Sequence, residues 1–194
     1  MHSESADMKP VPPPPSATSS RGWIVEAFNG LFLERRYGDI RVGDIVNDAG
    51  VGRSTFYEHF RSKDDVFRQS VAPVLEPMAD AVTDDGGDLT AIEHILRHFL
   101  EYQKQVRAML GGESACLVTD TLADMIEQRL PLSADGSQRH LIIPIRLAAL
   151  QIAEGQLGLV RGWLQGEAPC EPSVMAEAIR KSAKGTLAGL KSPT

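Results

Sequence analysis

The sequence has little that would cross-link or anchor a chain. Only two cysteines occur in 194 residues, which excludes a disulfide scaffold and a zinc site built from CxxC pairs. No apolar run reaches the roughly 18–20 residues that a membrane-spanning helix needs, and the N-terminus shows no apolar run of the signal-peptide type. Hydrophobic residues make up 42% and charged residues 24% of the chain, as in globular proteins. We therefore expect a cytoplasmic protein with no membrane partner and no cofactor.

An excess of positive charge, which is usual in nucleic-acid binders, is also lacking. The net charge is −6, from 20 basic and 26 acidic residues. Residues 21–70 carry eight of each sign, whereas residues 71–194 carry eleven basic and sixteen acidic residues. Any affinity of the N-terminal part for DNA must therefore come from the placement of a few cations rather than from bulk charge.

The N-terminal 20 residues differ in composition from the rest of the chain. They contain five of the twelve prolines, four of them consecutive, and they offer little that a core could bury. Proline donates no backbone hydrogen bond and favours the extended polyproline conformation. We expect residues 1–20 to form a disordered, proline-rich tail, which serves either as a passive extension or as a docking motif for a partner.

The remaining sequence has the periodicity of helices. Apolar residues recur three or four positions apart, as on one face of a helix, and no stretch of five or more residues alternates with the period of a strand. Ser62 at an N-cap with Asp65 three positions later indicates a helix start, and Pro73 and Pro77 should bend that helix or end it early. The predicted fold is all-α, with helices over about 21–37, 42–49, 54–60, 62 onward, 89–109, 114–130, 140–166 (with Pro144 in its first turn) and 173–190 (with Ser173 as N-cap).

Residues 42–60 carry the one pattern that points to a function. Two short helices are joined by Ala49-Gly50-Val51-Gly52, and a tight turn of this length with glycine is typical of the helix-turn-helix motif. In that motif the second helix enters the major groove of DNA. Spacing alone favours a structural helical corner over DNA binding, since such pairs are common in ordinary helical cores.

The residues from Ile45 to Lys63 resemble the TetR family of transcriptional regulators. The family signature has an isoleucine–alanine pair, then Ala-Gly-Val-Ser, Thr-Leu-Tyr, His-Phe and Ser-Lys, and most of these types occur here at the same offsets. The likeness covers about 50 residues, from Arg21 to about Ser70. It implies a three-helix helix-turn-helix domain over residues 21–68, which binds double-stranded DNA. It further implies a helical ligand-binding and dimerisation domain over residues 69–194.

The resemblance also implies which residues contact DNA. Arg53, Ser54 and Thr55 would face bases or nearby phosphates, and the remaining contacts would go to the phosphate backbone. Tyr57 could instead serve the small core, and His59 could be structural. The implied DNA-binding residues are Arg21, Arg41, Arg53, Ser54, Thr55, Tyr57, His59 and Lys63.

Several residues depart from the family pattern. Gly52 replaces the usual serine and Arg41 the common threonine, so two helix N-caps lack a capping side chain. Gly43 leaves a bare position on the first helix of the motif, and Val46 is larger than the usual alanine. Glu58 places an acid near the expected phosphates. Glu58 and the zero net charge of residues 21–70 predict weak non-specific DNA binding, and strong salt sensitivity of the binding that remains.

A stripe of small residues in the second half predicts a homodimer. Glycine inside a helix costs about 1 kcal/mol relative to alanine, so its repeated use suggests that another helix approaches closely. The alternative is packing within one subunit. The predicted interface residues are Gly155, Gly158, Gly162 and Ala183.

A ligand pocket is expected between the helices of the second half. A mixed apolar set with tyrosine and glutamine suits a small, mostly apolar effector with one or two polar anchors, although for each single residue ordinary core packing is the favoured alternative. His94 and His98 are four residues apart and could in principle grip a metal ion, but an exposed pair is the expectation and no metal site is predicted. The candidate lining residues are Phe99, Tyr102, Gln103, Met109, Met125, Leu147 and Gln151.

Together these features predict a ligand-responsive transcriptional regulator rather than an enzyme. The hypothesis is a repressor that binds a palindromic operator as a homodimer and is released by an unidentified small-molecule effector. An all-α enzyme and an adaptor that does not bind DNA remain as alternatives. The sequence shows no nucleophile–base spacing and no phosphate-binding glycine loop that would favour an enzyme.

Overall fold

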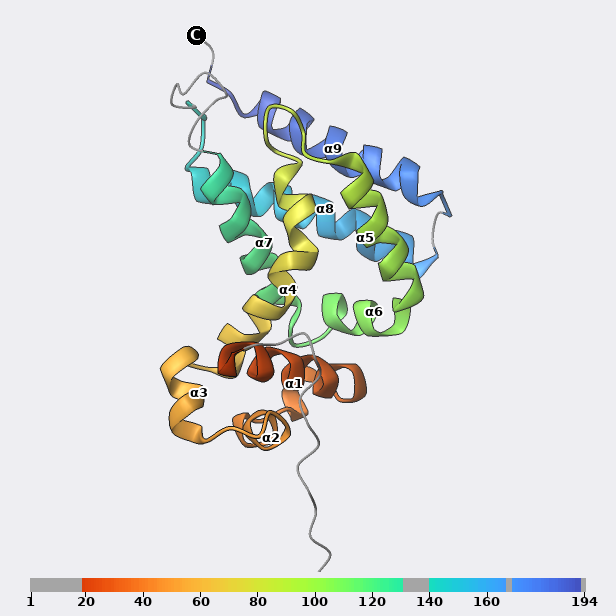
Figure 1. Cartoon of the computed structure of the whole chain (residues 1–194). Helices are drawn as coiled ribbons and strands as arrows, with labels where there is room; N and C mark the ends of the chain where they lie inside the picture. The colour runs from red at the N-terminus through yellow and green to blue at the C-terminus, as the bar shows by residue number, and fades with distance from the viewer. Residues whose placement is uncertain (1–18, 131–139, 167–168, 193–194) are drawn as a thin grey trace, which may run out of the picture. The chain divides into compact units, whose positions relative to one another are not determined.

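The computed structural model describes residues 19–130, 140–166 and 169–192 (Figure 1). In these residues the secondary structure is helical apart from one isolated β-bridge between Leu141 and Lys191, so the expected all-α fold is confirmed. The predicted disordered tail lies outside the described residues up to residue 18. The elements are α1 (Ser20–Glu34), η1 (Tyr37–Asp39), α2 (Val42–Asp48), α3 (Arg53–His59), α4 (Lys63–Asp80), α5 (Leu89–Glu101), α6 (Gln103–Gly111), α7 (Ala115–Arg129), α8 (Ile145–Gln165) and α9 (Pro172–Gly189).

The chain divides into two compact units between Ser70 and Val71, inside α4. The sequence places the corresponding boundary between residues 68 and 69. None of the helices in the described residues combines the length and the apolar composition needed to cross a membrane.

The N-terminal unit is built around a cluster of aromatic rings. Phe28 of α1 and Phe67 of α4 are completely buried, with their ring centroids 6.1 Å apart. Phe32 and Tyr37 complete the cluster, with ring centroids 5.6 and 5.2 Å from that of Phe67. Edge-to-face pairs at such distances add to the free energy gained from burial. This cluster ties α1 and the segment after it to the first turns of α4.

The start of α4 follows the predicted capping pattern. The Ser62 hydroxyl accepts a hydrogen bond from the Asp65 N–H at 3.2 Å, as an N-cap residue should. The Asp65 carboxylate accepts from the Arg61 N–H at 2.9 Å, which lies one residue before the N-cap. The predicted N-cap is therefore confirmed. In a standard capping box the third helical side chain accepts from the N–H of the N-cap residue, whereas here Asp65 accepts from the N–H one residue earlier.

The sequence predicts that two prolines bend α4 or end it early, and the second of these alternatives is wrong. The helix includes Pro73 and Pro77 and continues to Asp80. Each proline removes one N–H from the helix ladder. The helix persists because Leu75 and Met78 beside them are 1% and 0% exposed, and burial of such side chains contributes about 1.5–3 kcal/mol each.

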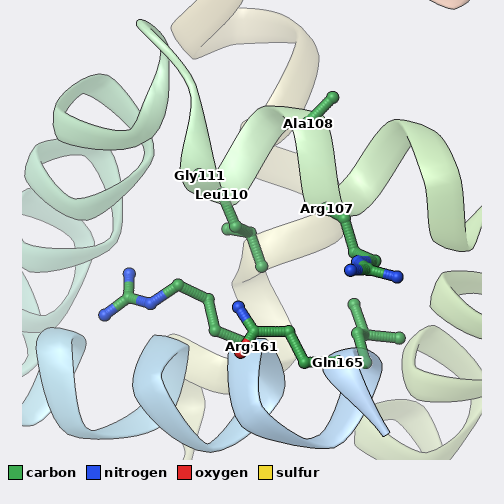
Figure 2. A pocket seen from close by; sticks show the side chains of 7 residues that line it. Arg107, Ala108, Leu110, Gly111, Arg161 and Gln165 are labelled. Carbon is green, nitrogen blue, oxygen red and sulfur yellow. The ribbon is translucent and has the colours of Figure 1, made fainter.

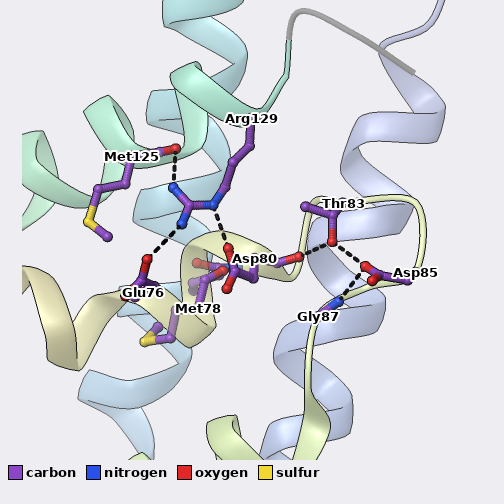
Figure 3. Close-up of polar contacts among 9 residues, drawn as sticks. Glu76, Met78, Asp80, Thr83, Asp85, Gly87, Met125 and Arg129 are labelled. Atoms are coloured by element: carbon purple, nitrogen blue, oxygen red, sulfur yellow. Dashed lines mark hydrogen bonds and ion pairs between the residues drawn. The ribbon is translucent and has the colours of Figure 1, made fainter. Parts of the chain in front are cut away.

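The C-terminal end of α4 is held by neighbouring helices of the second unit (Figure 3). The Arg129 guanidinium of α7 donates to the Asp80 carboxylate at 2.5 Å and lies 3.5 Å from that of Glu76. The carboxamide of the buried Gln156 of α8 donates to the Met78 carbonyl at 3.0 Å. Beyond the helix, the Thr83 hydroxyl and the Gly87 N–H donate to the Asp85 carboxylate at 2.5 and 3.1 Å, which closes the turn that leads to α5.

The second unit packs around the long helix α8. This helix lies against α7 on one side and α9 on another, while α5 packs on α9 and α6 contacts both α7 and α8. Arg146 of α8 adds ion pairs to the carboxylates of Asp120, Asp124 and Glu127 on α7, at 3.2, 2.5 and 3.4 Å. The inward residues of α8 include Ala148, Ala149 and Ala153, all 0% exposed. Their small side chains allow the neighbouring helices to approach α8 closely.

One predicted helix is two helices in the structure. The segment 89–109, expected as a single helix, is interrupted at Tyr102, whose φ of −109° and ψ of 31° are not helical. The two parts have different packing partners, α9 for α5 and both α7 and α8 for α6. The Gln103 carboxamide, at the first residue of α6, donates to the Leu164 carbonyl at 2.6 Å. The break therefore turns the chain from one partner helix to another, which apolar periodicity alone does not reveal.

Two helix starts also differ from the predictions. Helix α8 begins at Ile145 rather than at residue 140, with Pro144 at its N-cap rather than in its first turn. The residues before it pair instead with the end of the chain, since the Ile142 N–H donates to the Leu190 carbonyl at 2.9 Å. Helix α9 has Pro172 at its first position and not Ser173 at its N-cap. Proline suits a first helical position because its missing N–H is not needed there.

The aromatic cluster yields a stability prediction. Replacing Phe67 by alanine should lower the free energy of unfolding of the N-terminal unit by about 3–5 kcal/mol, because a fully buried ring and its contacts are lost. Leu33→Ala is the matched control, since this α1 side chain is 54% exposed and its loss should change stability by less than about 0.5 kcal/mol. Denaturant unfolding followed by circular dichroism measures both. Equal effects of the two substitutions would contradict the packing described.

Candidate nucleic-acid interface

The turn between α2 and α3 has the geometry of a tight helical corner. Gly50 has a φ of +64°, a left-handed conformation that glycine adopts without strain. The Val51 N–H then donates to the Val46 carbonyl at 3.1 Å, which closes the end of α2. Gly52 is the N-cap of α3 and makes no side-chain capping bond, as its lack of a side chain predicts. The two helices therefore meet at a fixed turn four residues long.

Helix α3 is anchored by one side and free on the other. Phe56 is completely buried, and its ring contacts that of Phe60 with centroids 5.9 Å apart. Arg53 and Ser54 are exposed, and Tyr57 is 58% exposed. Residues three or four apart share a helix face, so these three side chains form one outward surface. Tyr57 touches the core only through the edge of the Phe56 ring, with centroids 5.3 Å apart.

The remaining predicted contacts of α3 lie at the edges of this surface. Thr55 is half-buried, and His59 is exposed at the last residue of the helix. Glu58 is also exposed, so an acid stands beside the surface that the sequence assigns to DNA. A phosphate near Glu58 would meet like charge, which works against non-specific binding.

The guanidinium of Arg53 lies beside the bare position on α2. A methyl group placed on Gly43 would be 3.7 Å from Nη2 of Arg53, an ordinary van der Waals contact. Among the described residues, the Arg53 side chain makes no hydrogen bond or ion pair. It thus keeps its full hydrogen-bonding capacity for a partner outside the chain.

Arg41 and Arg21 play different parts within the unit. Arg41 is exposed at the N-cap of α2, where its N–H donates to the Asp44 carboxylate at 2.8 Å. This bond makes up for part of the capping that threonine would provide. Arg21 donates to the Gln69 side chain at 2.7 Å, and its guanidinium carbon lies 5.6 Å from the Phe60 ring centroid. Arg21 therefore ties α1 to α4 and to the end of α3, whereas the Arg41 guanidinium is free to reach outward.

Lys63 is engaged inside the domain, which the sequence did not indicate. Its ammonium group donates to the Tyr37 carbonyl at 2.8 Å and lies 4.2 Å from the centroid of the Tyr37 ring. The Tyr37 hydroxyl in turn donates to the Asp64 carboxylate. Burial, followed by this contact with Asp64, raises the pKa of Tyr37 well above its usual range. An ammonium has three donors, so Lys63 keeps capacity for a phosphate while it braces the start of α4.

The predicted ligand residues differ in their burial. Phe99 and Met109 are core residues, 2% and 8% exposed, Met125 is half-buried, and Gln103 is bonded to α8 as described. Tyr102 and Leu147 are 40% and 53% exposed, and Gln151 is also exposed. One hollow in the second unit lies between α6 and α8 (Figure 2). It is lined by Arg107, Ala108, Leu110, Gly111, Arg161, Leu164 and Gln165.

The predicted interface residues divide into two groups. A methyl group on Gly155 would meet no atom within 4 Å, and one on Gly158 would meet only Nη2 of Arg161, at 3.9 Å. Gly162 is half-buried. Ala183, in contrast, is 2% exposed and packs inside its own subunit. Packing within the subunit therefore does not require glycine at positions 155 and 158. Ala183, by contrast, is not on the surface.

The histidine pair does not form a metal centre in the described residues. His94 and His98 are both exposed, and Nδ1 of His98 lies 3.8 Å from the Glu101 carboxylate. The His98 ring also contacts Tyr102, with centroids 4.6 Å apart. No group of three or more candidate ligands is close enough to hold a metal ion in this part of the chain.

Comparison with known proteins agrees with this geometry. Residues 24–69 match the family model described as bacterial regulatory proteins of the tetR family. The structure resembles a TetR-family regulator from Streptomyces coelicolor A3 with a TM-score of 0.55 and 18% identity, covering 92% of this chain and 99% of that one. A TetR regulator from Streptococcus agalactiae 2603V is 22% identical over 84% of this chain and 93% of that one, with a TM-score of 0.49. No curated protein matches the chain.

The matched segment contains α2, the glycine turn and α3, the elements whose outward surface is described above. The structural likeness supports the same fold for the described residues as a whole. The resemblance deduced from the sequence is thereby confirmed: residues 24–69 match the tetR family of bacterial regulatory proteins, and the described residues share the fold of a TetR-family regulator.

Proposed function

We propose that this regulator is a ligand-responsive repressor, which binds a palindromic operator as a homodimer and acts by binding rather than by turnover. The observation that carries the DNA contact is the outward surface of α3. Its Arg53 guanidinium has no partner among the described residues, and a planar fork of donors suits the O6 and N7 acceptors of guanine. Ser54 and Tyr57 on the same surface supply hydroxyl groups for neighbouring bases or phosphates.

The proposed dimer uses the exposed side of α8. Gly155 leaves that side open, and Leu147 and Leu159 on the same helix are 53% and 36% exposed. A second copy of α8 that approached along the glycines would cover these apolar side chains. A two-fold dimer presents the same surface from each subunit. It would offer two α3 helices to half-sites about 34 Å apart, one turn of the duplex.

The proposed response to ligand runs through α4. This helix begins at Lys63, which braces the DNA-binding domain, and ends at Asp80, which is bonded to α7 through Arg129. Gln156 holds the same end to α8. An effector that shifted α7 or α8 would therefore move the end of α4. The DNA-bound state would lose population because the ligand prefers the other arrangement.

The role of α3 is tested by substitution. A duplex is first selected from a random library by the purified protein, and its affinity is measured by gel shift. Arg53→Ala should weaken binding by about 1–3 kcal/mol, because one bidentate contact to a base is lost. Arg97→Ala on α5 is the control, since it removes an arginine that is paired with Glu93 and lies outside the DNA-binding domain. Unchanged affinity of the Arg53 variant, with its helical content intact, would refute the proposed contact.

The interface is tested by placing a large charged side chain on α8. Gly155→Arg should fold, because the position is open within the subunit, but it should shift the protein from dimer to monomer and weaken operator binding. Gln128→Arg adds the same charge at an exposed position of α7 and should leave the dimer intact. Light scattering after gel filtration measures the mass of each variant. A dimer that persists in the Gly155→Arg variant would exclude this side of α8 as the interface.

A further inference from the structure

The hollow between α6 and α8 has a partly apolar wall. Its volume is about 290 Å³, and Leu110 and Leu164 in its lining are 3% and 0% exposed. Gly111 contributes no side chain. Figure 2 shows Leu110 reaching from α6 toward the middle of the hollow, with the Gln165 carboxamide facing it from α8. The hollow can therefore take a short apolar group beside one polar anchor.

The lining of the hollow is basic, whereas the surrounding unit has an excess of acidic residues. Residues 71–194 carry sixteen acidic and eleven basic residues, yet the hollow is lined by two arginines and by no acid. The Arg107 guanidinium makes no hydrogen bond or ion pair among the described residues. Arg161 is only partly engaged, through one bond of 3.0 Å from Nη2 to the Glu154 carboxylate. Figure 2 shows the two guanidinium groups at opposite ends of the hollow.

The helix ends at the hollow supply no positive charge of their own. Helix α6 ends at Gly111 and α8 at Gln165, and both of these residues line the hollow. The C-terminal end of a helix carries partial negative charge, which disfavours an anion. One terminal carbonyl, that of Leu164, is covered by the Gln103 carboxamide. Any attraction for an anion must therefore come from the two guanidinium groups.

We infer that this hollow binds a small organic anion, a carboxylate or a phosphate monoester with a short apolar chain, whose charged head pairs with Arg107. The inference rests on the proposed function, because it names the chemical class of the effector. A guanidinium matches either head group with two parallel N–H···O bonds. The chain lies against Leu110 and Leu164. Glu154 pairs with Arg161 and competes with the ligand for it.

The test is calorimetric titration of the full-length protein with ligands that share one chain and differ in head group. The probes are hexanoate, hexyl phosphate, hexanol and hexylamine. At least one of the two anions should bind, at least about tenfold more tightly than hexanol, since a hydrogen bond to a charged group commonly contributes a tenfold gain or more. Hexylamine should not bind. The preferred anion then identifies the head group.

Three variants assign the binding to this site. Arg107→Gln should weaken anion binding about tenfold or more, whereas Lys104→Gln, an exposed residue of α6 outside the lining, should leave it unchanged. Glu154→Gln should strengthen it, because Arg161 is released. Binding of hexanol as tight as that of the anions, no binding of either anion, or equal losses from the Arg107 and Lys104 variants would overturn the inference.

The outcome is separable from that of the proposed function. Titration needs no DNA, so an anion that binds through Arg107 supports the site even if the operator complex stays intact on its addition. In that case the anion site is supported and the proposed release of DNA by ligand is refuted. If an unrelated compound releases the operator while neither anion binds, the proposed release of DNA by ligand is supported and the anion site is refuted.

Discussion

The orientation of α3 depends on the burial of one ring, that of Phe56. Helix α3 has only seven residues, too few to be stable alone in water, so it holds its shape through packing. Phe56 is 0% exposed and fixes which side faces the core. The opposite side then necessarily presents Arg53 and Tyr57. The left-handed turn at Gly50 sets the direction in which α3 leaves α2, and together these two constraints fix the direction in which the outward surface of α3 faces.

A third constraint is the continuity of α4 despite its two prolines. The first turn of this helix contributes Lys63 and Phe67 to the N-terminal unit, and its last turn contributes Asp80 to the contacts with α7. Burial around Leu75 and Met78 maintains the helix where backbone bonds are missing. Helix α4 is therefore held at each end by specific side-chain contacts, by Lys63 in the N-terminal unit and by Asp80 in the second unit.

The sequence predicted the local features well and the long-range ones less well. The glycine turn and the Ser62 cap depend on neighbours within a few residues, so turn and capping rules found them. The break at Tyr102 depends on which helices α5 and α6 pack against, and the lining of the α6–α8 hollow follows from that break. Likewise, the contact of Lys63 with the Tyr37 carbonyl joins residues 26 positions apart, a distance over which spacing carries no information.

The central claim is that Arg53 reads a base edge, and the most direct measurement combines protein and DNA substitutions. Each guanine of a selected operator is replaced in turn by 7-deazaguanine, which lacks the N7 acceptor. The account predicts that one replacement per half-site weakens binding of the natural protein and has no further effect on the Arg53→Ala variant. If no replacement weakens binding, or if the loss is the same in the variant, α3 does not read DNA in the manner described.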